Sequence, residues 1–221
     1  MPQSTPRERL LDGGSLVASA VPHIGGPLSN IISGIAQGRR MNRVISFLSE
    51  LSERLRLVEI AGDARYLKSD EFEELLEQAL HRVAAERHAS KRAVYREFLA
   101  DVVVQPKCGY DEQLAFIRTL EQIQPDHLRV LWAMAQPPGD TSSMLTWSPG
   151  AALRRRLPGM VPESIRDRVA ELNDFRLAKM NSLNTMMTPD GAENLAGSIT
   201  PSGHRFLKYI LEAPDDGDGD S

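Results

Sequence analysis

Apolar residues recur at helical spacing along most of this 221-residue chain, and this pattern constrains its fold more than any other feature. The spacing is i, i+3, i+4 and i+7, which places the apolar side chains on one face of a helix. The first such set is Leu28, Ile31, Ile32 and Ile35, and a second set of Val44, Phe47, Leu48, Leu51, Leu55 and Val58 follows. Since Gly38 stands between the two sets, the pattern predicts either one long helix kinked near Gly38 or two helices in series.

Start signals predict further helices up to residue 135. Asp70, followed by Glu73, resembles a capping box, and Ser90 and Asp111 open the next two apolar-periodic runs. Pro125 suits the first turn of a helix, where its missing N–H costs nothing. An apolar share of 41% with only 5% aromatic residues is likewise typical of a mostly helical protein.

The formal net charge of −4 arises at the C-terminal end. Four of the 30 acidic residues are Asp215, Asp216, Asp218 and Asp220, and without them 26 acidic residues face 26 basic ones. A balanced body provides no global electrostatic argument for nucleic-acid binding, which usually needs a basic excess. The Gly-Asp tail, residues 214–221, is predicted to be solvated and disordered.

The cysteine content and the lack of a recognisable targeting pattern favour a cytoplasmic protein. Cys108 is the only cysteine, so an internal disulfide is impossible and a reducing compartment is expected. We expect no catalytic role for this thiol, because no histidine lies near it in sequence. The N-terminal residues lack the order of charges and apolar residues of a secretory signal, and no apolar run is long enough for a transmembrane helix.

Residues 13–38 contain no Asp, Glu, Lys or Arg, and His23 is the one residue among them that can carry a charge. Small side chains alternate with aliphatic ones along this segment. A membrane-acting helical effector could use such a segment. However, an interfacial helix needs a basic polar face and bulky anchors, and this segment has no Trp, Phe, Lys or Arg. Packing of residues 13–38 on the protein itself is therefore the favoured interpretation.

The C-terminal part has the order of elements of a winged helix-turn-helix. Predicted helices at residues 126–135, 148–157 and 162–174 are followed by a predicted β-hairpin and a short closing helix. The strands of the hairpin are expected at residues 176–180 and 197–203, on either side of a polar loop that contains Gly191. The residues that carry this pattern are Leu128, Leu131, Leu153, Ile165, Val169, Leu172, Leu177, Ile199, Thr200-Pro201-Ser202-Gly203, Phe206 and Leu207. This part of the chain resembles the winged helix-turn-helix superfamily, whose members bind DNA, bind proteins or dimerise.

In the DNA-reading members of that superfamily the third helix enters the major groove. On a helical wheel, the arc of residues 162–174 opposite its apolar face is acidic, with Glu163, Asp167, Glu171 and Asp174. Carboxylates there would approach a wall of phosphates, which is electrostatically costly. We therefore expect these four residues to contact a protein partner or a second copy of the chain, and nucleic acid is disfavoured.

DNA binding stays open as an alternative because basic residues flank this arc. The residues that would contact nucleic acid are Arg154, Arg155, Arg156, Arg166, Arg168 and Lys179. A run of three arginines more often lies on a solvated helix face than binds backbone phosphates.

Catalytic and metal-binding patterns are weak. Glu77 and His81 have the i, i+4 spacing of a pair of metal ligands on a helix. His81 and His88 are seven residues apart, which is two helical turns, and Glu86 does not complete a set of ligands with helical spacing. The sequence contains no Gly-rich phosphate loop, nucleophile elbow or Cys-x-x-Cys pair. We therefore predict a protein that is not an enzyme and that holds no cofactor or metal.

A looser likeness covers most of the chain. It rests on residues 22–28 (Pro-His-Ile-Gly-Gly-Pro-Leu), 43–51, 92–98 and 200–203. These motifs resemble a group of uncharacterised bacterial proteins that is similar to the abortive-infection alpha family of helical proteins. The resemblance implies a non-enzymatic cytosolic protein with a role in phage defence or stress.

Together these patterns predict a mostly α protein with an N-terminal helical bundle and a C-terminal winged-helix-like module that contains a small β-hairpin. The predicted parts are an irregular segment 1–27, a helical bundle 28–106, a winged-helix-like domain 111–213 and the acidic tail. The boundary is placed near Lys107, with Gln124 as the other position that the pattern allows.

Overall fold

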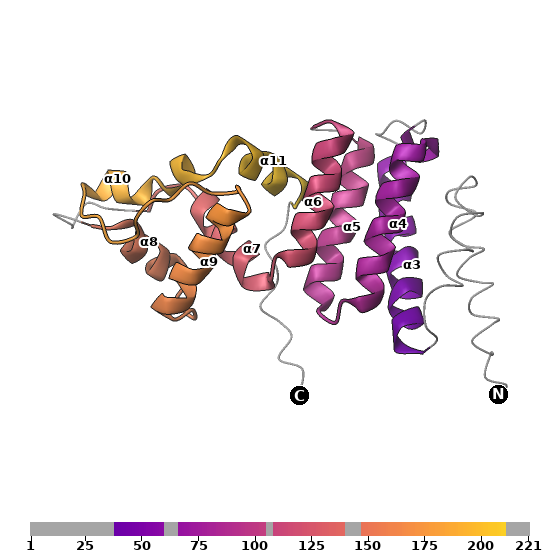
Figure 1. Ribbon diagram of the computed structural model, residues 1–221, viewed down its shortest axis with the longest axis horizontal. Coiled ribbons are helices and arrows are strands. Elements are labelled where there is room, and N and C mark those ends of the chain that lie inside the picture. The colour runs from indigo at the N-terminus through magenta and orange to yellow at the C-terminus, as the bar shows by residue number, and fades with distance from the viewer. Residues whose placement is uncertain (1–37, 60–65, 105–107, 140–146, 211–221) are drawn as a thin grey trace. The chain divides into compact units, whose positions relative to one another are not determined.

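The computed structural model describes residues 38–59, 66–104, 108–139 and 147–210, and these are mostly helical, as predicted (Figure 1). The described residues fall into two compact units, and the division between them lies after Glu121. Several predictions lie outside the described residues: the irregular segment 1–27, the helix face at 28–35, the apolar segment 13–38 and the acidic tail.

The first unit is a bundle of α3 (Arg39–Glu59), α4 (Asp70–Ala85), α5 (Ala89–Val104) and α6 (Tyr110–Gln122), with a 3-10 turn η1 (Tyr66–Lys68) before α4. α3 packs against both α4 and α5 (Figure 1). The predicted apolar faces form the core, and each fully buried aliphatic or aromatic side chain contributes about 1.5–3 kcal/mol. The largest of these side chains are Phe72, Leu75, Leu76, Leu80, Tyr95, Phe98, Leu99, Ile117 and Leu120.

Two helix starts in this unit have clear local causes. α3 begins directly after Gly38, whose φ of 94° is a conformation that favours glycine. α4 begins at Asp70, but its cap is Ser69, whose hydroxyl accepts the Phe72 N–H at 3.2 Å. The predicted Asp70–Glu73 capping box is thus wrong by one residue: Ser69 takes the N-cap, and Asp70 lies in the first turn, where a carboxylate favours the helix dipole.

α6 belongs to the first unit, so the division lies near Gln124 and not near Lys107. Its burial explains this assignment, because Phe116, Ile117 and Leu120 have 2% or less of their surface exposed. Side-chain contacts add to it: the Tyr66 hydroxyl donates to Gln113 at 2.8 Å.

The second unit contains α7 (Pro125–Ala135), α8 (Pro149–Arg156), α9 (Pro162–Asp174), α10 (Pro189–Glu193), a 3-10 turn η2 (Leu195–Ser198) and α11 (Pro201–Tyr209). A proline occupies the first turn of each α-helix, as predicted for Pro125. α7 packs against α8 and α9, and α8 also contacts α9 and α10. The buried residues of this core include Leu128, Leu131, Leu153, Ile165, Leu172 and Phe206.

The predicted β-hairpin is absent from the described residues of the second unit. The two segments that were expected to form its strands meet through one antiparallel bridge, Ala178 with Ile199, and α10 and η2 occupy the chain between them. A second isolated bridge joins Trp147 to Met187. A pair of strands needs several alternating residues in register, whereas this stretch is broken by Pro189, which starts a helix instead.

Candidate interaction surface

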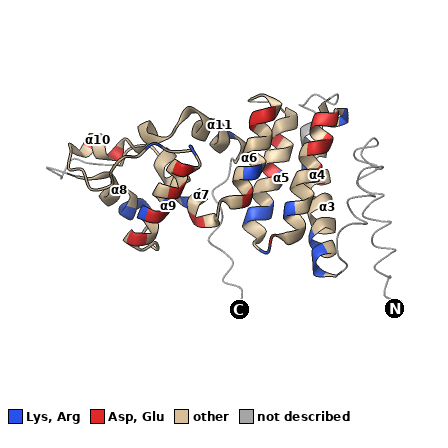
Figure 2. Ribbon diagram, viewed as in Figure 1, with Lys and Arg blue, Asp and Glu red and all other residues tan. Residues whose placement is uncertain are grey.

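α9 carries the acidic residues that the sequence singled out (Figure 2). Ile165, Val169 and Leu172 bury its inner face, as the helical wheel predicted. Glu163, Asp167 and Asp174 are exposed, and we call these three residues the acidic strip. Glu163 also lies in the first turn of α9, where the helix dipole stabilises a carboxylate.

Glu171 differs from the acidic strip because its carboxylate is engaged within the unit. Its Oε2 atom contacts Nε2 of His127, and the Arg168 guanidinium lies 2.8 Å away as an ion pair. The Glu171 side chain is 41% exposed, while that of His127 is 2% exposed. Glu171 therefore holds α9 to α7, and we leave it out of the contact surface.

His127 was not singled out from the sequence. It is the third residue of α7, and its Nδ1 accepts the Gln124 N–H at 2.9 Å, which closes a capping box at the start of the helix. Burial lowers the pKa of His127 below its usual range, although Glu171 acts in the opposite direction. The available signal was the spacing of Gln124 and His127 around Pro125.

Half of the basic residues proposed for DNA contact are committed to internal ion pairs. Arg155 and Arg156 each place a guanidinium nitrogen 2.7 Å from the carboxylate of Glu193. Arg156 also donates to the carbonyl of Ala133 at 2.7 Å, near the end of α7. Together with the Arg168–Glu171 pair, these contacts occupy three of the six candidate cations.

Glu193 is the centre of this cluster and was missed in the sequence. It has no exposed surface, and the Gly139 N–H donates to its Oε2 at 3.2 Å. Burial alone would raise the pKa of this carboxyl, but hydrogen bonds from Arg156 and Gly139 and the charge of Arg155 outweigh it and lower the pKa. The sequence held one weak indication of burial, because Glu193 directly follows Ala192 and lies two residues before Leu195. Both of these apolar residues are buried in the structure.

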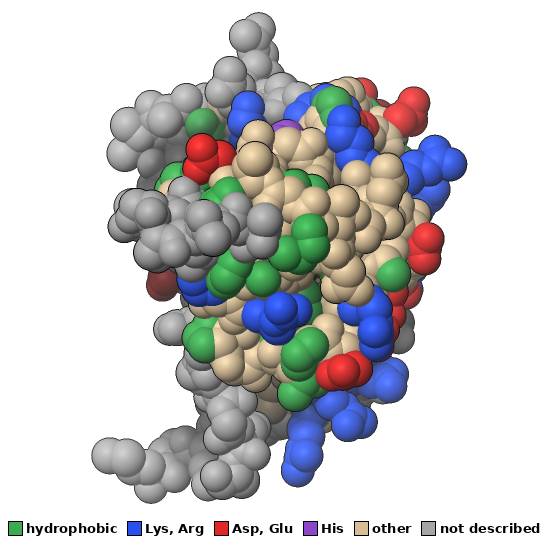
Figure 3. All heavy atoms as spheres, turned by 90° about the vertical axis from the view of Figure 1, so that its left-hand side faces the viewer, with side chains coloured by type: hydrophobic (Ala, Val, Ile, Leu, Met, Phe, Trp, Pro, Cys, Tyr) green, Lys and Arg blue, Asp and Glu red, His purple; other side chains and the backbone are tan. Residues whose placement is uncertain are grey.

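The remaining candidates, Arg154, Arg166 and Lys179, are exposed on three different segments. Arg176 adds a fourth exposed cation that was not among the candidates, directly after α9. On the face of the molecule in Figure 3, hydrophobic side chains lie mainly toward the middle and charged ones mainly around the edge, where basic side chains gather at the lower right beside a few acidic ones. Acidic side chains also lie on this face, so it is of mixed charge, whereas DNA binding favours a uniformly basic surface.

The residues considered for metal binding do not assemble into a site. Nε2 of His81 lies 3.9 Å from Oε1 of Glu77, and both side chains are at least half exposed. The backbone N–H of His88 donates to Glu86, whose carboxylate also lies 3.4 Å from the ammonium of Lys91. Among residues 38–59, 66–104, 108–139 and 147–210, no three His, Cys, Asp or Glu residues are grouped so that they could hold a metal ion.

The chain matches no model of a protein family, no curated protein and no solved structure. None of the helices that the structure describes combines the length and the apolar character needed to cross a membrane.

Proposed function

We propose that the chain is a non-enzymatic interaction or regulatory protein that docks on a protein partner, or on a second copy of itself, through the acidic strip of α9. The observation that carries this proposal is the division of charges in the second unit. Its acidic strip is exposed to solvent, whereas Arg155, Arg156 and Arg168 are engaged by Glu193 and Glu171. On α9 itself three exposed carboxylates stand against one exposed cation, Arg166, so its available charge suits a basic protein surface better than a phosphate backbone.

The order of helices in the second unit supports a winged-helix-like interpretation. α7, α8 and α9 follow one another as the three helices of such a module, and the Ala178–Ile199 bridge lies where its wing would begin. In the module that we propose, one bridge and the short helix α10 replace the hairpin. Phage defence or stress, which the sequence resemblance implies, is the setting in which a partner should be sought.

DNA binding is the alternative, and Arg154, Arg166 and Lys179 are the exposed residues in its favour. Each phosphate neutralised contributes a slope of about 0.9 in log affinity against log salt, so three contacts give a slope of about 2.7. Six contacts would have given about 5.4. Fluorescence anisotropy with a labelled duplex, titrated from low to moderate salt, measures this slope, and sub-micromolar sequence-selective binding would contradict our proposal.

Docking on a second copy can be tested with charge reversal. We expect the triple variant Glu163→Lys, Asp167→Lys, Asp174→Lys to lose any concentration-dependent dimer seen in sedimentation velocity. The matched control is Glu53→Lys, Glu71→Lys, Glu77→Lys, which changes the charge equally on exposed residues of the first unit. Glu71 lies in the first turn of α4 as Glu163 lies in that of α9, so both variants lose the same kind of favourable dipole interaction. Equal loss of dimer in both variants would refute a specific role for the strip.

A further inference from the structure

Arginines gather at one end of the first unit, where α3 begins, α4 ends and α5 begins. Nη2 of Arg43, near the start of α3, donates to the Ala84 carbonyl at 2.7 Å, near the end of α4. Nη1 of Arg92, near the start of α5, donates to the Arg87 carbonyl at 2.8 Å, in the turn between α4 and α5. We call the six arginines of these segments the basic end: Arg39, Arg40, Arg43, Arg82, Arg87 and Arg92.

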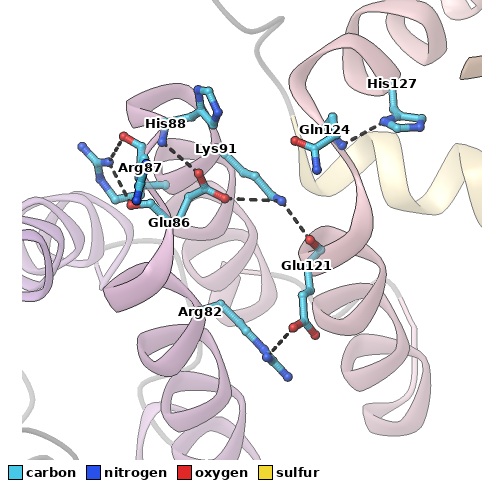
Figure 4. A network of polar contacts seen from close by, with 9 residues as sticks. Arg82, Glu86, Arg87, His88, Lys91, Glu121, Gln124 and His127 are labelled. Atoms are coloured by element: carbon cyan, nitrogen blue, oxygen red, sulfur yellow. Dashed lines mark hydrogen bonds and ion pairs between the residues drawn. The ribbon is translucent and has the colours of Figure 1, made fainter. Parts of the chain in front are cut away.

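Two carboxylates and Lys91 lie among these arginines (Figure 4). Arg82 pairs with the Glu121 carboxylate, and Nζ of Lys91 lies 3.4 Å from the Glu86 carboxylate. The same Nζ atom donates to the backbone carbonyl of Glu121 at 2.9 Å, so the ends of α4 and α6 and the start of α5 are tied together. Arginine stays protonated in proteins, so six arginines against two carboxylates leave an excess of four positive charges, without counting Lys91.

Local helix energetics do not explain the arginines at the start of α3. The first turn of an α-helix favours carboxylates, because the helix dipole places a positive partial charge there. The first turn of α3 nevertheless holds the exposed Arg39 and Arg40 and no acidic residue, whereas α4 and α9 begin with carboxylates. Figure 2 shows this contrast within the bundle, with a basic start of α3 and an acidic start of α4. Residues that oppose a local preference are expected where a function requires them.

We infer, on the basis of the proposed docking of the acidic strip, that this strip binds the basic end of a second copy of the chain. Charge complementarity selects the two surfaces, because the three exposed carboxylates of the strip would meet an excess of four positive charges. Each copy carries one strip and one basic end, so the contact joins different surfaces of the two copies. Association of this kind continues beyond a dimer unless the assembly closes.

The dimensions of the two surfaces agree with this contact. Glu163 and Asp174 are eleven residues apart on α9, which is about 16 Å at 1.5 Å per residue. Helices that pack against each other have axes about 8–10 Å apart, and α3 packs against both α4 and α5. The acidic strip is therefore long enough to meet arginines from more than one segment of the basic end. Ala170, which is exposed between Asp167 and Asp174, is too small to obstruct the approach.

The test reverses the three exposed arginines of α3 and the α4–α5 turn in the full chain, as Arg39→Glu, Arg40→Glu, Arg87→Glu. Two of the new carboxylates lie in the first turn of α3, where the helix dipole favours them, so the melting temperature should not fall. Sedimentation velocity over a concentration series at low salt should show self-association at least about tenfold weaker than in the wild type. Like charges facing each other across an interface cost more than the about 1.4 kcal/mol that a tenfold change represents.

A matched control reverses three exposed cations outside the basic end, as Lys68→Glu, Arg154→Glu, Lys179→Glu. This variant has the same net charge as the end-reversed variant and should associate like the wild type. Salt provides a second readout, since the Debye length falls from about 10 Å at 0.1 M to about 3 Å at 1 M and the association should weaken accordingly. Equal weakening in the control and the end-reversed variant would overturn a specific contact at the basic end.

A mixture of two variants identifies which surfaces meet. The end-reversed variant keeps the acidic strip, and the strip-reversed variant Glu163→Lys, Asp167→Lys, Asp174→Lys keeps the basic end. Each variant alone should stay monomeric, because its two surfaces then carry the same sign of charge. An equimolar mixture should associate, because the basic end of one copy meets the acidic strip of the other. A mixture that stays monomeric would contradict the pairing.

A failure of this inference is distinguishable from a failure of the proposed function. If strip reversal abolishes association and end reversal does not, the acidic strip docks on another surface, and only the inference is wrong. If the wild type stays monomeric at every concentration, the inference is wrong and a different protein is left as the partner of the strip. A labelled DNA duplex that binds the wild type and is released by end reversal, without association of copies, would assign the basic end to nucleic acid and overturn the inference.

Discussion

Replacing Glu193 by Gln removes one negative charge from the most deeply buried ionic cluster of the second unit. The carboxylate has no exposed surface, and the Arg156 side chain that it neutralises is only 10% exposed. Removing one partner of a buried ion pair leaves the other charge uncompensated, which typically costs 3–5 kcal/mol. Since the Arg155 side chain is 35% exposed and thus screened by solvent, we place the expected loss at the lower end, about 3 kcal/mol.

The assay can isolate the second unit, because both tryptophans of the chain, Trp132 and Trp147, lie in it. Urea unfolding followed by tryptophan fluorescence therefore reports this unit, and far-UV circular dichroism reports both. For a unit of about 100 residues, a loss of about 3 kcal/mol lowers the melting temperature by roughly 12 °C or more. The matched control is Asp167→Asn, which removes the same charge from an exposed position in the middle of α9 and should change stability by less than about 0.5 kcal/mol.

A double-mutant cycle sharpens this test. If Glu193 and Arg156 stabilise the unit as a pair, the double variant Glu193→Gln, Arg156→Gln should be more stable than the sum of the single losses predicts, by at least about 0.5 kcal/mol. A Glu193→Gln variant as stable as the wild type would refute the reasoning, because a buried carboxylate between two arginines would then contribute nothing. The functional proposal would be weakened too, because it assumes that the ion pairs of Arg155 and Arg156 with Glu193 are stable enough to keep these arginines from other partners.

Three further results are expected. Gly203→Ala should destabilise the second unit strongly, because the new Cβ would lie 2.1 Å from the Leu177 carbonyl oxygen. Gly159→Ala places its Cβ in open space and should be tolerated, so thermal melts of the two variants test this difference. Arg176 has a φ of 58°, so Arg176→Gly should raise the free energy of unfolding by up to about 1 kcal/mol, and a clear loss in urea unfolding would contradict this strain. The folded pKa of His127 is depressed, so its contribution to stability is complete above pH of about 6.5 and is lost as the pH falls through the folded pKa; urea midpoints that stay constant between pH 7.5 and 5 would oppose this.

Local signals predicted the helices well. The limits Pro162–Asp174 of α9 follow from a proline at the first turn and an apolar face at 3.6-residue spacing, and both depend only on neighbours in sequence. The same holds for Pro125 at the start of α7 and for the interruption at Gly38. At α4, Ser69 and Asp70 are both good capping residues, so the sequence alone left the start ambiguous by one position.

Local sequence signals could not predict the ion pairs that leave the acidic strip exposed and engage the arginines. Arg156 meets Glu193 across 37 residues, and no periodicity within either helix encodes that pairing. The hairpin was predicted from residues 176–180 and 197–203 and the polar loop between them, a pattern that is also compatible with short helices. In the folded unit Thr188 and Thr200 cap α10 and α11, so the predicted Thr200-Pro201-Ser202-Gly203 turn is instead the start of a helix.

The most direct test of the docking proposal is photocrosslinking in expressing cells. A benzophenone amino acid at position 167 places the probe in the middle of the acidic strip, and the same residue at position 204 places it on the exposed face of α11. We predict discrete protein adducts, or a dimer of the chain, from position 167, weak labelling from position 204, and loss of the adducts when Glu163 and Asp174 are changed to Lys. Adducts with nucleic acid, or the same protein adducts from both positions, would contradict the account.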